Sequence, residues 1–346
     1  MKRAISVLLS AIIFLGPAGS AFAWGEDGHQ AVGKIASLRI KRLTAQKIAR
    51  ILKPGETLAN IASWADSVKE RMGKTDPDPD TNAFLQDLAH NEKNREWHYD
   101  DLPLDCKNYQ TCTGFTPDND IVHMLNVCIR TLQGHRDPNH PLSQRNALKL
   151  IVHFLGDIHQ PLHVGCGFID VNGPNGKILI VRDPVVVKRK DLPSDKGAND
   201  LIINNDRKNL HSFWDFTLVT SLMNVIGKEI TSDALGKYLE KTVRPKASWN
   251  PRGPVNTWAA QWATDSLQLS RDHTYKSVRI TGQRTIPVLT RDGDPVMRDG
   301  QPVMQTVFDI TRPSNYEALN RELVRQQLAK GGYRLAKLLD AIYSAK

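Results

Sequence analysis

Apolar residues recur at helical spacing along most of the chain, and this pattern predicts a mainly helical protein. The first such segment, residues 29–52, has its apolar positions at Val32, Ile35, Ala36, Leu38, Leu43, Ile48 and Ile51. The same spacing predicts further helices over 54–72, about 118–134, 143–160, several segments between 209 and about 270, and 320–343. Residues 74–82 are expected to form a polar loop, and the segment from Arg95 to Pro103 a short extended stretch.

Two stretches depart from the helical pattern. Residues 165–205 are glycine-rich at first, and 177–190, KILIVRDPVVVKRK, then alternate in the manner of a β-hairpin. Residues 274–290 predict a strand that leads into RDGDPVMRDGQPVM, a seven-residue near-repeat with two Asp-Gly turn signals. Two copies are too few for a solenoid, so a surface hairpin is expected. The predicted fold class is mainly α, a single multi-helix domain with β-hairpin-like insertions at about 166–196 and 278–310.

The first 23 residues have the pattern of a secretory signal peptide. Lys2 and Arg3 precede an apolar run from Ala4 to Leu15, and Ala21-Phe22-Ala23 offers small residues where a signal peptidase cuts. The alternative, a membrane anchor, needs roughly 20 apolar residues, and this run is shorter. Cleavage after Ala23 would leave residues 24–346 as the mature, exported chain, periplasmic or secreted, with Trp24 carrying a free α-amine.

Composition narrows the partners only slightly. The chain is 24% charged and 40% hydrophobic, as in ordinary globular proteins, and its formal net charge is +9. A basic balance favours polyanionic partners, but a basic exported protein without any role in nucleic-acid binding fits equally well. No later segment is long and apolar enough to span a membrane, so we expect no stable membrane association, and a monomer.

The four cysteines, Cys106, Cys112, Cys128 and Cys166, are an even count in a chain predicted to be exported, which favours disulfides. Three pairings are possible. We predict a bond between Cys106 and Cys112 across the DCKNYQTC turn, which leaves Cys128 to pair with Cys166. A thiolate zinc site is the alternative, although the sequence has no Cys-x-x-Cys pair.

The segment HFLGDIHQPLH, residues 153–163, carries the densest candidate chemistry. His153 and Asp157 are four residues apart, about 40° around a helix, so both can address one ion. Pro161 ends the helix, and His163 can return toward the same place. The apolar neighbours of the pair would make unpaired polar groups costly. His159 lies off that face, and we assign it a structural role.

A second pair with the same spacing, His211 and Asp215, lies in NLHSFWD. Imidazole and carboxylate together suit divalent metals such as zinc. Further ligand-type residues occur in SWAD, EWHYD and near the new N-terminus, and these are Asp66, His98 and His29. The remaining histidines lie in polar or loop surroundings and are expected not to bind metal: His90, His123, His135, His140 and His273.

The order of these motifs, WGxxGH, WAD, WHYD, HFxGDxxQPLH, NLHxxWD and the terminal GGYRLAKLLDAIY, resembles the zinc-dependent single-strand-specific nucleases of fungi, plants and bacteria. The likeness covers most of the mature chain. It implies the helical fold of the trinuclear-zinc phospholipase C/nuclease superfamily, with three zinc ions in a cleft. It also implies hydrolysis of single-stranded DNA and RNA to 5′-phosphorylated products, together with 3′-nucleotidase activity.

The resemblance distributes the ligands over three zinc sites. The first would be held by Asp66, His98, His153 and Asp157. The second would be held by His163, His211 and Asp215. The third would be held by His29, by Asp157 as a bridge, and by the α-amine and carbonyl of Trp24, so that signal cleavage creates a zinc ligand.

The resemblance also implies substrate contacts. Lys69 matches a family position whose cationic side chain contacts the phosphate, and the alternative is an exposed helix lysine. Together with Asp66 and Asp157 it forms the expected catalytic set. Tyr99 could stack on a base, or be a structural aromatic. The family's Gly-Gly-Asn has its nearest equivalent in Gly197-Ala198-Asn199, displaced by the basic stretch 166–196, with Asn199 as the base-reading candidate.

Two other functions compete with a nuclease. A trinuclear-zinc phospholipase C shares the N-terminal Trp and the H-x3-D-x5-H block. That relative has Glu where this chain has Asp215, and a wider gap than the one from Trp24 to His29. A non-catalytic exported zinc-binding protein is the other alternative, and a complete ligand set with open metal positions argues against it.

Overall fold

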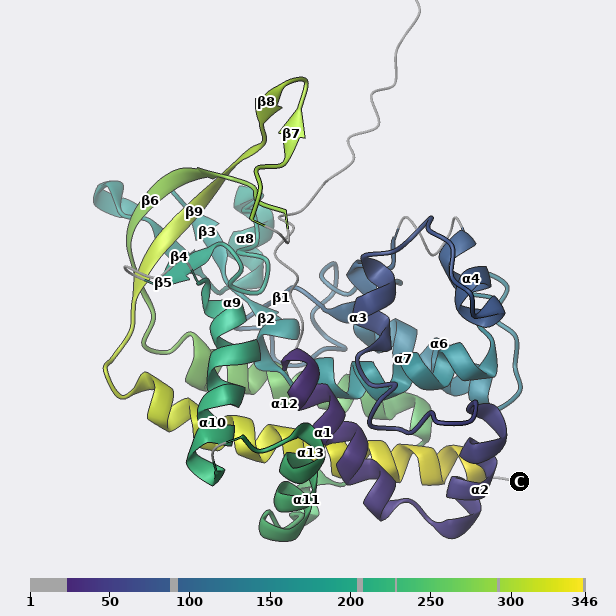
Figure 1. Ribbon diagram of the computed structural model, residues 1–346. Coiled ribbons are helices and arrows are strands. Elements are labelled where there is room, and N and C mark those ends of the chain that lie inside the picture. Colours follow the sequence, from purple (N-terminus) through teal and green to yellow (C-terminus); the bar gives the residue numbers. More distant parts are fainter. Residues whose placement is uncertain (1–23, 88–92, 204–207, 228, 291–292, 345–346) are drawn as a thin grey trace, which may run out of the picture.

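A long C-terminal helix organises the fold. The computed structural model describes residues 24–87, 93–203, 208–227, 229–290 and 293–344, so the signal-peptide prediction lies outside the described residues. Helix α13 (Tyr316–Ser344) crosses the whole helical body (Figure 1). Packed against it are α1 (Gly25–Arg39), α2 (Arg42–Ile51), α7 (Gln144–Asp157), α10 (Leu218–Ile226) and α11 (Ser232–Thr242).

Helix α7 lies at the centre of this body. Ser143 begins it, accepting a hydrogen bond from the Asn146 backbone N–H at 3.0 Å, and every residue from Asn146 to Asp157 is buried. It packs against α6 (Ile121–Leu132), whose N-cap Asp120 accepts from the His123 N–H at 2.7 Å. Because α7 is buried on all sides, the polar side chains at its C-terminal end lie inside the protein.

Shorter helices complete the body. They are α3 (Trp64–Lys69), α4 (Pro79–Gln86), α9 (Leu210–Ser212) and α12 (Trp258–Leu269), with single turns at Glu96–His98, Pro161–His163, Pro174–Gly176, Ala247–Trp249 and Val255–Thr257. Two π-helical turns, Phe213–Thr217 and Ser270–Thr274, follow α9 and α12. One continuous hydrophobic core joins these elements and encloses the side chains of Trp24, Trp97, Trp214 and Trp262.

The predicted helices over 118–134 and 143–160 are confirmed as α6 and α7, and the C-terminal helix as α13. The predicted extended stretch from Arg95 to Pro103 was partly wrong, since Glu96–His98 form a helical turn. Three boundaries were also wrong. The segment 29–52 forms two helices, since Ile40 and Lys41 are extended. The chain after Pro54 turns until Ser63, and only α3 is helical there. The polar loop contains the start of α4, because Asp78 caps it and Pro79 occupies its first turn.

The strands form small sheets beside the helical body. β1 (Leu102–Pro103) pairs in parallel with β2 (Gly165–Cys166), and β3 (Phe168–Asp170) pairs antiparallel with β4 (Leu179–Val181). The largest sheet has the order β5-β9-β6, formed by β5 (Leu201–Ile203), β9 (Met304–Thr311) and β6 (Arg279–Pro287). Its β6 and β9 extend into the projecting hairpin of β7 (Met297–Arg298) and β8 (Gln301–Pro302) (Figure 1).

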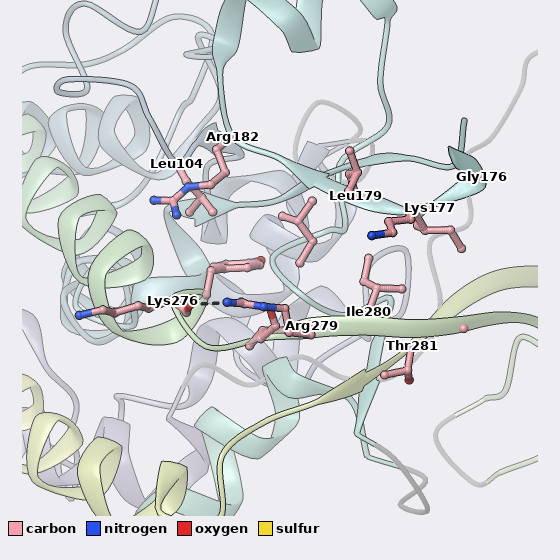
Figure 2. A pocket seen from close by; sticks show the side chains of 14 residues that line it. Leu104, Gly176, Lys177, Leu179, Arg182, Lys276, Arg279, Ile280 and Thr281 are labelled. Carbon is pink, nitrogen blue, oxygen red and sulfur yellow. Dashed lines mark hydrogen bonds between the residues drawn. The ribbon is translucent and has the colours of Figure 1, made fainter. Parts of the chain in front are cut away.

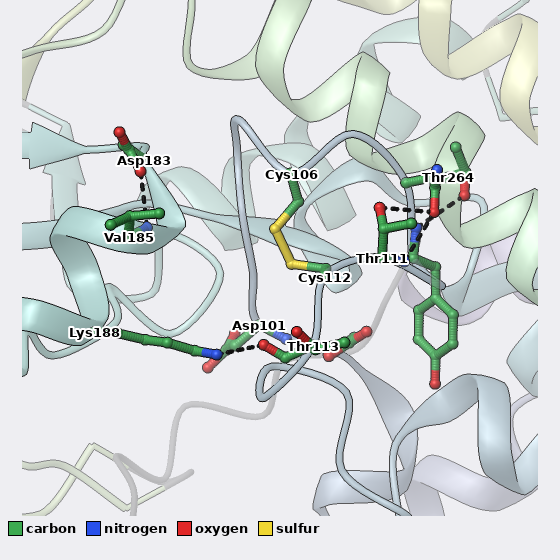
Figure 3. Close-up of a disulfide and its surroundings, with 12 residues drawn as sticks. Asp101, Cys106, Thr111, Cys112, Thr113, Asp183, Val185, Lys188 and Thr264 are labelled. Atoms are coloured by element: carbon green, nitrogen blue, oxygen red, sulfur yellow. Dashed lines mark hydrogen bonds between the residues drawn. A yellow bond between two sulfur atoms is a disulfide. The ribbon is translucent and has the colours of Figure 1, made fainter.

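The surface hairpin over 291–304 is confirmed, with residues 291–292 outside the described chain. Asp299 and Gly300 both have positive φ, 50° and 76°, as a type I′ turn requires. The prediction of a hairpin over 177–190 was wrong. β4 pairs back with β3, and 184–190 form α8 (Pro184–Lys190), because the Asp183 carboxylate accepts from the Val185 N–H at 2.7 Å (Figure 3).

Two cysteines are bonded and two are free. Cys106 and Cys112 form a disulfide that closes the loop before α6, as predicted (Figure 3). The predicted Cys128–Cys166 bond was wrong, and both thiols are free and buried. Cys128 lies on α6 in the main core, whereas Cys166 packs with Phe168 and Val187 in a separate cluster beneath α8. Pairing by elimination could not anticipate that separation.

Among the described residues, we find no helix with the length and apolar character that crossing a bilayer demands.

Thiol titration tests the disulfide assignment. Unfolded in guanidinium without reductant, the protein should release two reactive thiols, and none before unfolding, because Cys128 and Cys166 are buried. Replacing Cys106 and Cys112 by serine should lower the free energy of unfolding by about 2 kcal/mol, the chain-entropy value for so short a loop. If the unfolded wild-type protein had no titratable thiols, the prediction of a Cys128–Cys166 bond would be right after all.

Candidate metal centre

Eight of the nine metal-ligand candidates are side chains that the fold buries together. The exposed fraction of each is at most 3%. Their ligand atoms form three groups, each within 4.8 Å: His29, Asp66 and His153; His98, His153 and Asp157; and His163, His211 and Asp215. His90 lies outside the described residues. His123, His135, His140, His159 and His273 belong to none of the three groups found in the described chain.

Asp157 is the centre of the larger assembly. Its Oδ2 lies 3.0 Å from His98 Nδ1 and 3.1 Å from His153 Nε2, while its Oδ1 lies 3.3 Å from His29 Nε2. The imidazole rings of His29 and His153 stack with centroids 3.9 Å apart. Asp66 approaches from α3, its Oδ1 3.5 Å from His153 Nε2. One carboxylate therefore contacts three imidazoles with its two oxygens.

The second assembly contains the other His/Asp pair. His211 Nε2 lies 3.1 Å from His163 Nε2 and 3.2 Å from Asp215 Oδ2. Asp215 belongs to the π-helical turn 213–217, a local irregularity that is frequent at functional sites. His163 ends the short turn that Pro161 begins after α7. The two assemblies are thus joined through the seven-residue connection from Asp157 to His163.

Trp24 lies between these groups. Its backbone nitrogen is 3.3 Å from Asp215 Oδ1, and its indole N–H donates to the Gly156 carbonyl at 2.8 Å. The residue is fully buried, with φ 57°, at the start of α1. The main chain at Trp24 therefore faces the same buried space as the side-chain candidates.

Backbone carbonyls orient three of the histidines, a contribution that the sequence did not reveal. His153 Nδ1 lies 2.7 Å from the Ala62 oxygen, His163 Nδ1 2.8 Å from the His98 oxygen, and His211 Nδ1 2.6 Å from the Gly197 oxygen. A carbonyl accepts, so each Nδ1 is the protonated nitrogen and each Nε2 presents its lone pair to the cluster.

Two further residues were missed although HFxGDxxQPLH contains both. Gln160 accepts a hydrogen bond from the Leu162 N–H, which holds its amide in place. The amide then donates from Nε2 to Asp215 Oδ1 at 2.7 Å and so orients that carboxylate. Gly156 provides space, because a Cβ there would lie 2.4 Å from His29 Nδ1. Neither residue is a metal ligand by type, so only contact with the ligands identifies it.

Several polar atoms in this cluster are buried without a hydrogen-bond partner. They are both ring nitrogens of His29, His98 Nε2, Asp66 Oδ2, Asp157 Oδ1 and Asp215 Oδ2. A buried polar atom without a partner is destabilising by about 1–3 kcal/mol, and more when charged. Imidazole nitrogens and carboxylate oxygens are the donors that zinc takes. The residues present therefore fit a set of metal ions.

The protonation states of three groups, His98, His163 and Asp157, are those that bind metal. By contrast, burial alone would lower the pKa of His153 and of His211, but the adjacent Asp157 and Asp215 raise it. Burial lowers the pKa of both His98 and His163 to about 4, so their rings are neutral at physiological pH. Burial alone would raise the pKa of Asp157, but the adjacent His153, His29 and His98 hold that pKa well below its usual range. Neutral imidazoles and an ionised carboxylate are the forms that coordinate metals.

The structure places the three substrate-contact candidates around this cluster. Lys69 is 8% exposed, so the alternative of an exposed helix lysine was wrong, and its Nζ lies 2.5 Å from Asp66 Oδ1. Tyr99, 39% exposed, lines a cavity of about 520 Å³ with Phe115 and Asp101. Asn199 is half-buried, and its side chain donates to the Lys196 carbonyl at 2.8 Å. Its neighbour Gly197 contacts His211.

Comparison with known proteins identifies relatives along nearly the whole chain. The model of the family described as S1/P1 nuclease matches residues 24–344. Endonuclease 2 of Arabidopsis thaliana is 24% identical over an alignment 350 residues long, gaps included, which covers 98% of this chain and 97% of that protein. Nuclease S1 of Aspergillus oryzae is 24% identical over 345 residues, 93% of each chain. Nuclease P1 of Penicillium citrinum is 26% identical over 341 residues, 93% of this chain and 99% of that protein.

Proposed function

Because the chain belongs to the S1/P1 nuclease family, we propose that it is an exported trinuclear-zinc endonuclease acting on single-stranded DNA and RNA. The products would carry 5′-phosphates, and 3′-nucleotides would lose their phosphate. One observation carries the proposal: eight histidine and aspartate side chains converge in the interior with unpaired ligand atoms. Such a cluster would be costly to bury unless cations neutralised it.

The proposed ligand sets are those that the resemblance to the family implies, and the contacts around Asp157 and Asp215 support them. Asp66, His98, His153 and Asp157 would hold one zinc, and His163, His211 and Asp215 a second. His29, Asp157 and the main chain of Trp24 would hold the third, a set supported by the 3.3 Å approach of His29 Nε2 to Asp157 Oδ1. When bound, zinc supplies Lewis-acid stabilisation of phosphate charge and lowers the pKa of water.

Residues of this chain would position the substrate. Lys69, beside Asp66, puts a cation at the cluster, where it can neutralise a phosphate oxygen. Tyr99 follows His98 directly, and its partly exposed ring lines a cavity that also contains the aromatic side chain of Phe115. A base stacked there would be held without regard to its identity. Asn199 would contact the base from the loop that positions His211.

Two observations support export. The family match begins at Trp24, the residue that signal cleavage would make the N-terminus. The Trp24 nitrogen is buried beside Asp215, where an α-amine would reach the metal cluster. We therefore propose that the mature enzyme acts in the periplasm or outside the cell. That it is a monomer stays a prediction.

The proposed activity can be tested against its rivals in one assay. Purified mature protein should release acid-soluble nucleotides from single-stranded DNA and RNA, faster than from duplex, because bases must leave the stack to reach an aromatic ring. A chelator should abolish the release, and zinc should restore it. Products should bear 5′-phosphates; 3′-phosphate or cyclic ends would indicate another mechanism. With phosphatidylcholine as a parallel substrate, release of phosphocholine instead would support the phospholipase. No turnover of any substrate would support the non-catalytic zinc-binding protein.

Zinc content tests the ligand sets. Elemental analysis should find about three zinc ions per mature chain, given four-coordinate sites completed by water. Asp157→Ala should lose more than one of them, because Asp157 contacts His29, His98 and His153. Activity should fall by more than about 100-fold, the upper range for losing a residue that merely supports a ligand. A single zinc, or mainly magnesium, in the wild type would contradict the trinuclear site.

The N-terminus provides a third test. A variant that keeps one Met before Trp24 should fold but lose zinc and most of its activity, because an amide nitrogen has no lone pair to donate. The added residue would also carry the amine beyond zinc–nitrogen bonding distance, about 2.0–2.1 Å. Trp24→Phe with the correct terminus is the matched control and should keep much of the activity. Full activity and zinc content in the extended protein would exclude the α-amine as a ligand.

A further inference from the structure

A second cavity lies outside the metal centre, between the two β-rich segments. Its volume is about 720 Å³, and its walls come from residues 176–182, which include β4, and residues 275–282, which include the start of β6. Leu104, just after β1, closes it on the inner side. The volume is that of a typical ligand pocket. None of the metal-ligand candidates lines it.

The charge of this cavity has one sign. Lys177, Arg182, Lys276 and Arg279 line it, and no carboxylate is among its described lining residues. Figure 2 shows Lys177, Arg182 and Arg279 around the space, and Lys276 at its edge with the side chain extending outward. In the part of the chain that the structure describes, neither Lys177 nor Lys276 has a carboxylate within ion-pair distance. Both lysines are exposed. The positive potential of the cavity is therefore largely uncompensated.

The two arginines are held in place by their own surroundings. Arg279 donates from Nη1 to the Val278 carbonyl at 2.8 Å and to the Lys276 carbonyl at 3.3 Å (Figure 2). Arg182 Nε lies 3.2 Å from Asp105 Oδ1, and both side chains are more than a third exposed, so this pair is weak. A guanidinium has five N–H donors, and these contacts use one or two of them. Each arginine retains donors for an anion.

The apolar part of the wall is aliphatic. Leu179, Ile180 and Ile280 line the cavity between the cations, and the Leu179 side chain is 38% exposed. Cations around an apolar floor suit a ligand that alternates anionic groups with flat apolar ones. A phosphodiester chain with its bases is such a ligand, and phosphate contacts of this kind do not depend on base sequence.

The cavity is also tied to the metal centre by a short stretch of chain. Leu104 follows His98 by six residues, which an extended chain spans in at most about 22 Å. The Asp100 N–H donates to the His163 carbonyl at 2.9 Å, and β1 pairs with β2 directly after His163. At roughly 3.4 Å per stacked nucleotide, a strand of about seven nucleotides covers this distance.

We propose that this basic cavity binds the phosphate backbone of single-stranded nucleic acid, several nucleotides away from the bond that is cut. The proposal rests on the proposed nuclease function and adds a specificity for substrate length. An oligonucleotide that reaches both sites gains affinity from the cavity, whereas a dinucleotide reaches only the metal centre. The contribution depends on salt, because phosphate neutralisation releases counterions.

Charge reversal at the two lysines without carboxylate partners tests the proposal. For Lys177→Glu/Lys276→Glu, KM for a single-stranded 20-mer should rise by roughly tenfold or more at 0.1 M salt, with kcat unchanged, because binding is lost equally in ground and transition states. The slope of log affinity against log salt should decrease in magnitude by about 1.4, because each of the two lost phosphate contacts contributes about 0.7. Both constants for a dinucleotide should stay at their wild-type values. Lys177→Gln/Lys276→Gln should show a smaller shift in the same direction.

The matched control makes the same change of charge elsewhere. Arg42 and Lys241 lie on α2 and α11, at the opposite end of the molecule from β4 and β6 (Figure 1). The variant Arg42→Glu/Lys241→Glu should therefore leave KM for the 20-mer unchanged. Melting temperature should be unaffected in all variants, since these side chains are exposed.

Each other outcome counts against the proposal. A double variant with wild-type kinetics on the 20-mer, or with equal losses on both substrates, overturns it while the nuclease function stands. Weaker binding to heparin with an unchanged 20-mer KM would assign the cavity to another polyanion. A wild type that cleaves neither substrate removes the nuclease function, and this proposal with it.

Discussion

The burial of three carboxylates and five imidazoles in one place is the constraint on which the rest of the structure depends. Asp66, Asp157 and Asp215 are at most 1% exposed, and water cannot solvate their charges. Asp157 meets three histidines, yet one of its oxygens still has no hydrogen-bond donor. Protons or metal ions must supply the missing positive charge. At neutral pH His98 and His163, with pKa values of about 4, are neutral and do not supply it. Burial alone would lower the pKa of His153 and His211, but Asp157 and Asp215 raise it, so these two rings hold protons in the places that a metal ion would take.

The fold supports this cluster with rigid elements. The central helix α7 is buried on every side and supplies His153 and Asp157 from its last turns. Carbonyls of Ala62, His98 and Gly197 orient the histidines, and Gln160 orients Asp215. Such contacts fix both the ring orientation and the protonated nitrogen before any ion binds. The N-terminal turn at Trp24 completes the enclosure, with its backbone nitrogen 3.3 Å from Asp215 Oδ1.

The β-rich segments have a different role from the helical body. They lie beside it and add β4, β6 and the projecting β7–β8 hairpin, while the helices enclose the metal centre (Figure 1). Four of their basic side chains line a cavity that has no carboxylate among its described lining residues, whereas the helical body encloses a cluster that contains three carboxylates. Chemistry and substrate retention are thereby divided between two parts of one domain, which lets electrostatic attraction act without disturbing the ligands.

The sequence by itself determined the helical class, the main helices and the ligand candidates, because helical spacing and the i, i+4 pairs at His153/Asp157 and His211/Asp215 are local properties. It also placed the Cys106–Cys112 bond, whose partners are close along the chain. The helix over 184–190 was also encoded locally, by the N-cap Asp183 and by Pro184, although our prediction missed it. Only the tertiary structure decided that Cys128 and Cys166 stay apart and that Lys69 is buried. It also revealed Gln160, Gly156 and the basic cavity. Each of these depends on which distant segments pack together, and no local pattern of residues encodes that contact.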